Sequence, residues 1–353
     1  MARRTSRNAR RDPLNTGSLT STTGAAAGDG RGAPAPARSR ARGEGAKNAT
    51  LPDGPVAIST GTAEVVRDPD HPERVTLHVN GVPSSGLDLA DPGFLDFEYM
   101  QQMAAVLALL PPGPLRVLHL GAAGSALARH VEHERPGSRQ LGVDLDARLL
   151  ELVREWFALP RAPRLRLRAD DAGRALAGTH PESWDVVVRD VFAGEVTPAH
   201  LAGTGFAAAA LRALRPGGVL LLNCADRPPL TLARRELASL AQVFGPGAAA
   251  SGRLAAIAEP AILKGRRYGN LVLAAVRGRP DDEAARAVAE RDPAGSRLDE
   301  ARDLDLRDPA LGRALRTLAV PATLLAGDDA TRFAGTAAPL GTAEPPAGFA
   351  PQP

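Results

Sequence analysis

The sequence predicts an α/β protein with a mostly parallel, seven-stranded sheet, preceded by a small antiparallel β unit. Short apolar runs alternate with segments of helical periodicity between residues 94 and 280. Runs that are apolar at nearly every position are typical of parallel strands covered on both faces. The last two runs, joined by a short turn, close the sheet as an antiparallel hairpin. A turn of small residues follows the first strand of the parallel sheet, which is where such sheets commonly bind nucleotides.

Residues 1–50 contain no Ile, Val, Phe, Tyr or Trp. Such a segment cannot bury enough apolar surface to offset its chain entropy, so we expect a disordered Arg/Ala/Gly-rich arm. The Arg-, Ser- and Thr-rich composition of residues 1–28 also resembles a transit peptide, an alternative that we rank below a disordered extension.

The charge of the chain is unevenly distributed. The 353 residues include 43 Lys+Arg and 40 Asp+Glu, a net charge of +3, and the sequence pI is about 9.6. Residues 1–50 carry 10 basic and 3 acidic groups, 51–280 carry 25 and 24, and 281–353 carry 8 and 13. The basic excess therefore belongs to the arm. A folded basic face, which nucleic-acid binding needs, is not indicated, and we expect no nucleic-acid partner.

Cys224 is the single cysteine, which excludes an intrachain disulfide and a cysteine-based zinc cluster and favours a reducing, cytoplasmic location. No apolar run approaches the roughly 18–20 residues that span a bilayer, so we expect no membrane partner. His130 and His133 lie three positions apart without a third ligand, and we expect no metal site.

The β unit is assigned to residues 51–93. Its β-branched runs at 62–67 and 74–80 are separated by a Pro-rich turn, and Asn80-Gly81 is a further turn signal. The main domain, 94–280, begins with a helical stretch at 94–110 that Pro111-Pro112-Gly113 ends.

The strands of the main domain follow in order. They are expected at 115–120, 140–143, 165–167, 184–188 and 219–222, with the closing hairpin at 254–258 and 271–276. A parallel sheet closed in this way is typical of Rossmann-like class I methyltransferase folds. Residues 281–353 are expected to form a partly helical, partly disordered tail.

The turn at 121–125, Gly-Ala-Ala-Gly-Ser, follows the strand that ends at Leu120. Gly121 and Gly124 allow the backbone to approach a cofactor closely, and the helix that follows offers unpaired N–H groups. These two glycines are therefore candidate cofactor-binding residues.

Two acids follow the next two strands. Asp144 ends the second strand, 23 positions after Gly121, where an acid binds ribose hydroxyls. The alternative is that Asp144 or Asp146 only caps the following helix; we assign the cap to Asp146 and ribose to Asp144. After the third strand, Asp171 is our candidate for binding the adenine amino group, because Ala172 begins the next helix.

Dinucleotides and adenosyl-sulfonium cofactors both satisfy this geometry. The turn lacks the third glycine of the dinucleotide fingerprint G-x-G-x-x-G. A Leu-Arg-Pro-Gly-Gly run at 214–218, before the fifth strand, is frequent in adenosylmethionine folds. We therefore favour an adenosyl-sulfonium co-substrate.

Across residues 58–280 the sequence resembles the spermidine synthase family, in its divergent actinobacterial type. The similarity includes the front β unit, the entry to Tyr99 at 87–99, the glycine turn, and the strand 184–190 that ends in Asp190. The resemblance implies that Asp190 accepts the proton of an attacking amine, a step the chemistry needs because only a deprotonated amine has a free lone pair. The alternative is a strand-end Asp that satisfies loop N–H groups. The resemblance also places Tyr99 at the substrate.

The sequence departs from the family pattern at several positions. The second acid of the strand-end motif is Ala193 here, and Glu195 is a candidate replacement for holding the amine. Where the family has a Tyr-His-Glu triplet, this chain has Tyr99-Met100-Gln101 and retains only the tyrosine. Where the family turn carries an Asp that disfavours a cofactor carboxylate, this chain has Gly124, which leaves intact S-adenosylmethionine open as a co-substrate.

The preferred hypothesis is a spermidine synthase-like transferase of polyamine biosynthesis that moves an aminopropyl group from decarboxylated S-adenosylmethionine to a small-molecule amine. The alternatives are an S-adenosylmethionine-dependent methyltransferase and a non-catalytic nucleoside-binding homologue. From the resemblance we also expect a homodimer or homotetramer.

Overall fold

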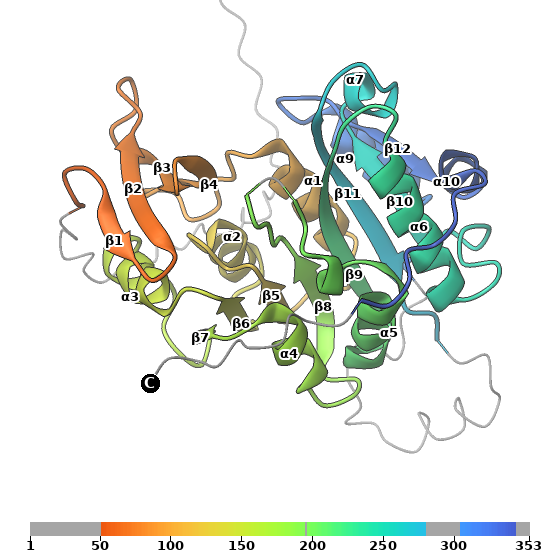
Figure 1. Cartoon of the computed structure of the whole chain (residues 1–353), viewed down its shortest axis with the longest axis horizontal. Helices are drawn as coiled ribbons and strands as arrows, with labels where there is room; N and C mark the ends of the chain where they lie inside the picture. The colour runs from red at the N-terminus through yellow and green to blue at the C-terminus, as the bar shows by residue number, and fades with distance from the viewer. Residues whose placement is uncertain (1–50, 195, 280–303, 344–353) are drawn as a thin grey trace, which may run out of the picture. The chain divides into compact units, whose positions relative to one another are not determined.

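The central sheet of the computed structural model has eight strands in the order β12-β10-β11-β9-β8-β5-β6-β7 (Figure 1). The structure describes residues 51–194, 196–279 and 304–343. The sheet strands are β5 (Arg116–Leu120), β6 (Arg139–Asp144), β7 (Leu165–Ala169), β8 (Trp184–Arg189), β9 (Leu214–Asp226), β10 (Leu254–Ala258), β11 (Gly269–Val276) and β12 (Thr323–Ala326).

Five neighbouring strands, from β9 through β8, β5 and β6 to β7, are parallel. The strand β11 pairs antiparallel with β9 and with β10, which makes the expected closing hairpin. The predicted fold class is therefore confirmed. Because the chain moves from β5 to one side through β6 and β7, and then to the other side through β8 and β9, the carboxyl end of β5 is a topological switch point.

Alternation along the strands explains why they are apolar throughout. Val186 and Val188 face one core cluster, and Val187 between them faces the other. The first cluster contains side chains of α1 (Glu98–Leu107), α2 (Ala126–Glu134), α3 (Ala147–Trp156) and α9 (Pro309–Arg316). The second contains side chains of α4 (Ala172–Ala177), α5 (Gly203–Ala213), α6 (Thr231–Phe244) and α10 (Asp328–Ala334). Both faces of the sheet are thus covered.

The front β unit is a four-stranded antiparallel sheet in the order β1-β2-β3-β4. Its strands are β1 (Val56–Ile58), β2 (Gly61–Arg67), β3 (Arg74–Val79) and β4 (Val82–Asp88). Asn80 and Gly81 form the β3–β4 turn with positive φ values of 53° and 77°, as the sequence signal indicates.

The segment expected as a tail contributes to the sheet. Residues 304–343 include α9, which packs against α1, and β12, which pairs antiparallel with β10. β12 is the eighth strand, one more than the sequence predicts. Residues 281–303 and 344–353 of the expected tail, and the arm at 1–50, lie outside the described residues.

Short elements complete the fold. The helix α7 (Pro260–Leu263) lies between β10 and β11, and the 3-10 helix η1 (Ala199–Leu201) follows β8. Among the described residues, no helix combines the length and the apolar character that crossing a bilayer requires.

Candidate functional site

The carboxyl ends of β5 and β8 meet at Gly121. Its φ is +87°, and a Cβ there would lie 2.0 Å from the carbonyl oxygen of Asp190. Only glycine avoids this overlap, so the close approach of the two strand ends depends on Gly121. The turn continues through Ala123 and Ser125, which also have positive φ values of 32° and 58°.

The β unit lies directly on this turn. The N–H of Gly124 donates to Ser85 Oγ at 3.0 Å, and a Cβ at position 124 would lie 2.7 Å from Ser85 Cβ. Arg129 of α2 also donates to the carbonyl of Asp88 at the end of β4. The strand β4 therefore occupies the space that a side chain at position 124 would need.

Asp144 and Asp146 have separate roles after β6. Asp144 accepts hydrogen bonds from the N–H groups of Ala123 (3.0 Å) and Asp146 (3.1 Å), so it holds the glycine turn against β6. Burial raises the pKa of Asp144, and these backbone bonds offset only part of that rise. Asp146 is the N-cap of α3 and accepts from Leu149, which confirms its assignment as the cap; ribose binding by Asp144 stays a prediction.

Asp171 is the N-cap of α4, accepting from the N–H of Arg174 at 2.9 Å. Its other carboxylate oxygen lies 3.0 Å from His200 Nε2. The neighbouring Asp170 forms ion pairs with Arg168 and Arg174. Asp171 is thus the acid of this pair that contacts η1, and adenine binding by Asp171 stays a prediction.

Asp190 accepts hydrogen bonds on both carboxylate oxygens. Tyr99 Oη donates to Oδ2 at 2.8 Å, and Asn223 Nδ2 donates to Oδ1 at 2.8 Å. Burial raises the pKa of Asp190, and the bonds from Asn223 and Tyr99 counteract it in part. Burial, with Asp190 beside it, also keeps the pKa of Tyr99 well above its usual value. Tyr99 therefore keeps its proton at neutral pH and donates it to Asp190 in a hydrogen bond.

The structure thus brings together Tyr99 of α1 and Asp190, the residue directly after β8, which are 91 positions apart in the chain. Sequence reasoning missed Asn223. Its signal was available, because Asn223 is the polar residue that interrupts the apolar run of β9, in the strand beside β8.

The chain after Asp190 turns at a single bridge between Ala193 and Val196. Val196 is 65% exposed and Leu145, directly after Asp144, is 43% exposed. Glu195, the candidate replacement for the second acid, lies outside the described residues. The described side chains of this turn are apolar.

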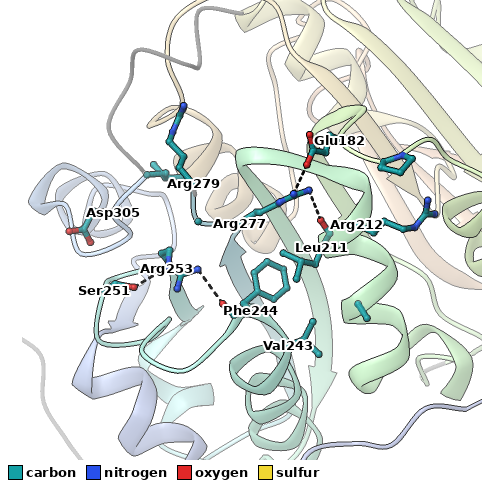
Figure 2. A pocket seen from close by; sticks show the side chains of 14 residues that line it. Glu182, Leu211, Arg212, Val243, Phe244, Ser251, Arg253, Arg277, Arg279 and Asp305 are labelled. Atoms are coloured by element: carbon teal, nitrogen blue, oxygen red, sulfur yellow. Dashed lines mark hydrogen bonds and ion pairs between the residues drawn. The ribbon is translucent and has the colours of Figure 1, made fainter. Parts of the chain in front are cut away.

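A cavity of about 1080 Å³ lies at the opposite edge of the sheet, near the start of β8 and the end of β11 (Figure 2). Its arginines bind backbone near helix ends: Arg253 donates to the carbonyl of Phe244 at the end of α6, and Arg277 donates to that of Leu211 in α5. Cations at helix C-termini are stabilising. Because Arg253 and Arg277 hold helix ends, and the carboxyl ends of β5 and β8 lie at the other edge of the sheet, the cavity is not our candidate site.

Metal ligands do not gather in the described part of the chain. The described residues contain no group of three or more His, Cys, Asp or Glu side chains that could hold a metal ion. His130 Nδ1 lies 2.8 Å from the carbonyl of Gly93, which is a structural contact.

The known proteins that resemble this chain include spermidine synthase-like proteins and a methyltransferase. A crystal structure of a probable spermidine synthase from Corynebacterium glutamicum is 33% identical, with a TM-score of 0.69, and the match covers 84% of this chain and 100% of that one. The polyamine aminopropyltransferase of Nitrosomonas europaea is 31% identical over 160 residues, 42% of this chain and 48% of that protein.

A methyltransferase is also similar. The eEF1A lysine and N-terminal methyltransferase of Homo sapiens is 27% identical over 199 residues, which is 52% of this chain and 28% of that protein. The chain therefore spans about half, or less, of the length of these curated relatives. No protein-family profile matches the sequence.

Proposed function

Because this chain belongs to the spermidine synthase-like family, we propose that it is a transferase that uses an S-adenosylmethionine-type co-substrate to alkylate an amine. The preferred reaction is transfer of an aminopropyl group from decarboxylated S-adenosylmethionine to a small-molecule amine, within polyamine biosynthesis. Asp190 is the proton acceptor.

The observation that carries the proposal is the environment of Asp190. Its two oxygens accept from Tyr99 and Asn223, which orient the carboxylate, and burial raises its pKa, which makes it a stronger base. Asn223 Oδ1 is buried without a partner among the described residues. A buried unpaired acceptor is costly, and an amine N–H beside Asp190 would satisfy it.

The reaction balances with this one base. The amine lone pair forms the new C–N bond while the bond from that carbon to the sulfonium breaks, and methylthioadenosine leaves. Asp190 takes the proton released by the amine and returns it to solvent. The co-substrate supplies the electrophilic carbon; the chain orients the amine and removes its proton.

For the nucleoside we propose the predicted residues. Gly121 and Gly124 admit the backbone close to the co-substrate, Asp144 accepts from ribose, and Asp171 accepts from the adenine amino group. The close approach of the turn at Gly121 to the backbone of Asp190, which puts the proposed nucleoside turn beside the proposed base, supports this assignment. Tyr99 contacts the amine, and Glu195 is proposed to hold its far end.

The test of the base is Asp190→Asn, which preserves shape and removes basicity. Product formation should fall at least about 100-fold, while methylthioadenosine affinity, measured by calorimetry, should stay within about twofold. The exposed Asp53→Asn is the matched control and should change neither. Retained turnover in Asp190→Asn would remove Asp190 from catalysis.

Methyl transfer from intact S-adenosylmethionine is the second candidate, and the observation that favours it is at position 124. Gly124 has no side chain to repel a carboxylate, and the neutral Ser85 fills the space in which an acid would stand. Calorimetry with both forms of the co-substrate decides between the candidates. Tighter binding of the intact form would contradict aminopropyl transfer and support methyl transfer. If neither form nor methylthioadenosine binds, the chain is a homologue without this chemistry.

Assembly and location are proposals of the same kind. We propose a homodimer or homotetramer, which light scattering tests directly, and a cytoplasmic location. The arm at 1–50, the β unit at 51–93, the main domain at 94–280 and the segment 281–353 are proposed as the organisation of the chain.

A further inference from the structure

His200 lies against Asp171, the acid that we assign to adenine. Its Nε2 is 3.0 Å from Asp171 Oδ2, and the two side chains are 9% and 15% exposed. The other oxygen, Oδ1, is occupied by the N–H of Arg174 in the first turn of α4. With its proton on Nε2 the imidazole donates to Asp171, so each oxygen has one fixed donor and retains capacity for a second.

Room for the imidazole is provided by Gly173. A Cβ at this position would lie 3.2 Å from His200 Cδ2 and 3.3 Å from Leu201 Cδ2, both tighter than ordinary van der Waals contact. The absence of a side chain on this turn of α4 thus lets η1 approach Asp171.

The 3-10 helix η1 is also held by β8, the strand that precedes the proposed base Asp190. Arg189, next to Asp190 and fully buried, donates to the carbonyl of Leu201 at 2.8 Å. Arg189 is itself paired with Glu236 at 2.7 Å. Since η1 is held at both His200 and Leu201, the position of His200 is tied to the strand that ends in Asp190.

We propose that His200 is a positioning residue for nucleoside recognition: it holds the Asp171 carboxylate in the orientation that accepts the exocyclic amino group of adenine. This inference rests on the proposed function, because it needs an adenine nucleoside at Asp171. A fixed carboxylate accepts from an amino group but not from the carbonyl oxygen of a 6-oxopurine, so His200 contributes to the choice of base as well as to affinity.

The test uses the full chain and two probes, methylthioadenosine and methylthioinosine, titrated by calorimetry. The parent protein should bind the adenine form more tightly. His200→Ala should lower methylthioadenosine affinity about tenfold and methylthioinosine affinity much less, since one hydrogen bond to a charged group is lost. His200→Gln, whose Nε2 can donate from a similar place, should restore most of the preference. The exposed His180→Ala is the matched control.

Three results would overturn the inference: unchanged affinities in His200→Ala, an equal loss for both nucleosides together with a lower melting temperature, or no restoration by His200→Gln. The first leaves the proposed function intact, and the second and third indicate a purely structural contact. Failure of the parent protein to bind either nucleoside would instead refute the proposed function itself, so the two failures are distinguishable.

Discussion

Replacement of Asp146 tests how the β unit is held against the nucleoside site. The Asp146 carboxylate accepts from the N–H of Leu149 (2.8 Å), the N–H of Ser59 (3.1 Å), and both the N–H (2.6 Å) and the hydroxyl (2.8 Å) of Thr60. One residue therefore caps α3 and binds the β1–β2 turn, directly beside Asp144.

The magnitude follows from these bonds. Loss of an N-cap costs about 1 kcal/mol. The three bonds to the turn contribute about 0.7 kcal/mol each, near the lower end of the range for ordinary hydrogen bonds and about 2 kcal/mol together, because Ser59 and Thr60 are exposed and their donors regain water. Asp146→Ala should thus lower the free energy of unfolding by about 3 kcal/mol. Asp146→Asn keeps one acceptor oxygen and should lose about half of that.

The assay is urea unfolding at pH 7, followed by calorimetry with methylthioadenosine on the folded variants. Thr60→Val removes only the hydroxyl bond and should cost about 1 kcal/mol or less, and the exposed Asp53→Ala should cost nothing measurable. A loss below about 1 kcal/mol for Asp146→Ala would refute the reasoning, since the cap alone accounts for that much.

The pH dependence of the same variant has a defined sign. Burial acts to raise the pKa of Asp146, but the hydrogen bonds from Leu149, Thr60 and Ser59 outweigh it, so the pKa lies below its ordinary value of 3.8. A depressed folded-state pKa contributes stability above 3.8 that is lost as the pH falls through the lower, folded-state value. The stability difference between the parent protein and Asp146→Ala should therefore shrink in strong acid; a constant difference would contradict the assignment.

Three further substitutions test the packing around the site. Gly121→Ala should destabilise by more than about 3 kcal/mol, because its Cβ would overlap the carbonyl oxygen of Asp190 at 2.0 Å; Gly81→Ala, also at positive φ but in open space, should cost clearly less in the same urea assay. Arg189→Met should cost about 3–5 kcal/mol because it leaves Glu236 buried and unpaired, and adding Glu236→Leu should recover most of this; no recovery would contradict the pairing. Leu315→Ala in α9 should cost about 2–5 kcal/mol, since this side chain is fully buried, whereas a surface-like loss below 1 kcal/mol would mean that α9 does not pack.

The strands and the acids at their ends were predictable because both depend on local pattern. An apolar run bounded by turn residues predicts a buried parallel strand, and a parallel sheet brings the residues after its strands to one edge. That is why Asp144 and Asp171 could be named as candidates from the pattern of strands, whereas Asp190 was named from the resemblance to a known family. The cap at Asp146 was predictable for the same reason.

The partners of these acids were not predictable, because they come from distant segments. Tyr99 reaches Asp190 across 91 positions, His200 reaches Asp171 across 29, and no spacing rule encodes such pairs. The strand β12 was missed because it has only four residues, all of intermediate burial. Its pairing with β10 depends on a tertiary contact rather than on a strong local preference.

The charges around the proposed site differ from the net positive charge of the whole chain. The excess positive charge of the chain belongs to residues 1–50. Arg189, next to Asp190, forms a buried ion pair with Glu236. Neutral donors hold the acids of the site: backbone N–H groups bind Asp144, and Tyr99 and Asn223 bind Asp190. Burial consequently raises the pKa of both acids, so keeping them ionised carries a desolvation cost. A cation beside them offsets this cost, whereas an anionic group increases it. This cost supports the proposed sulfonium co-substrate and amine over an anionic dinucleotide.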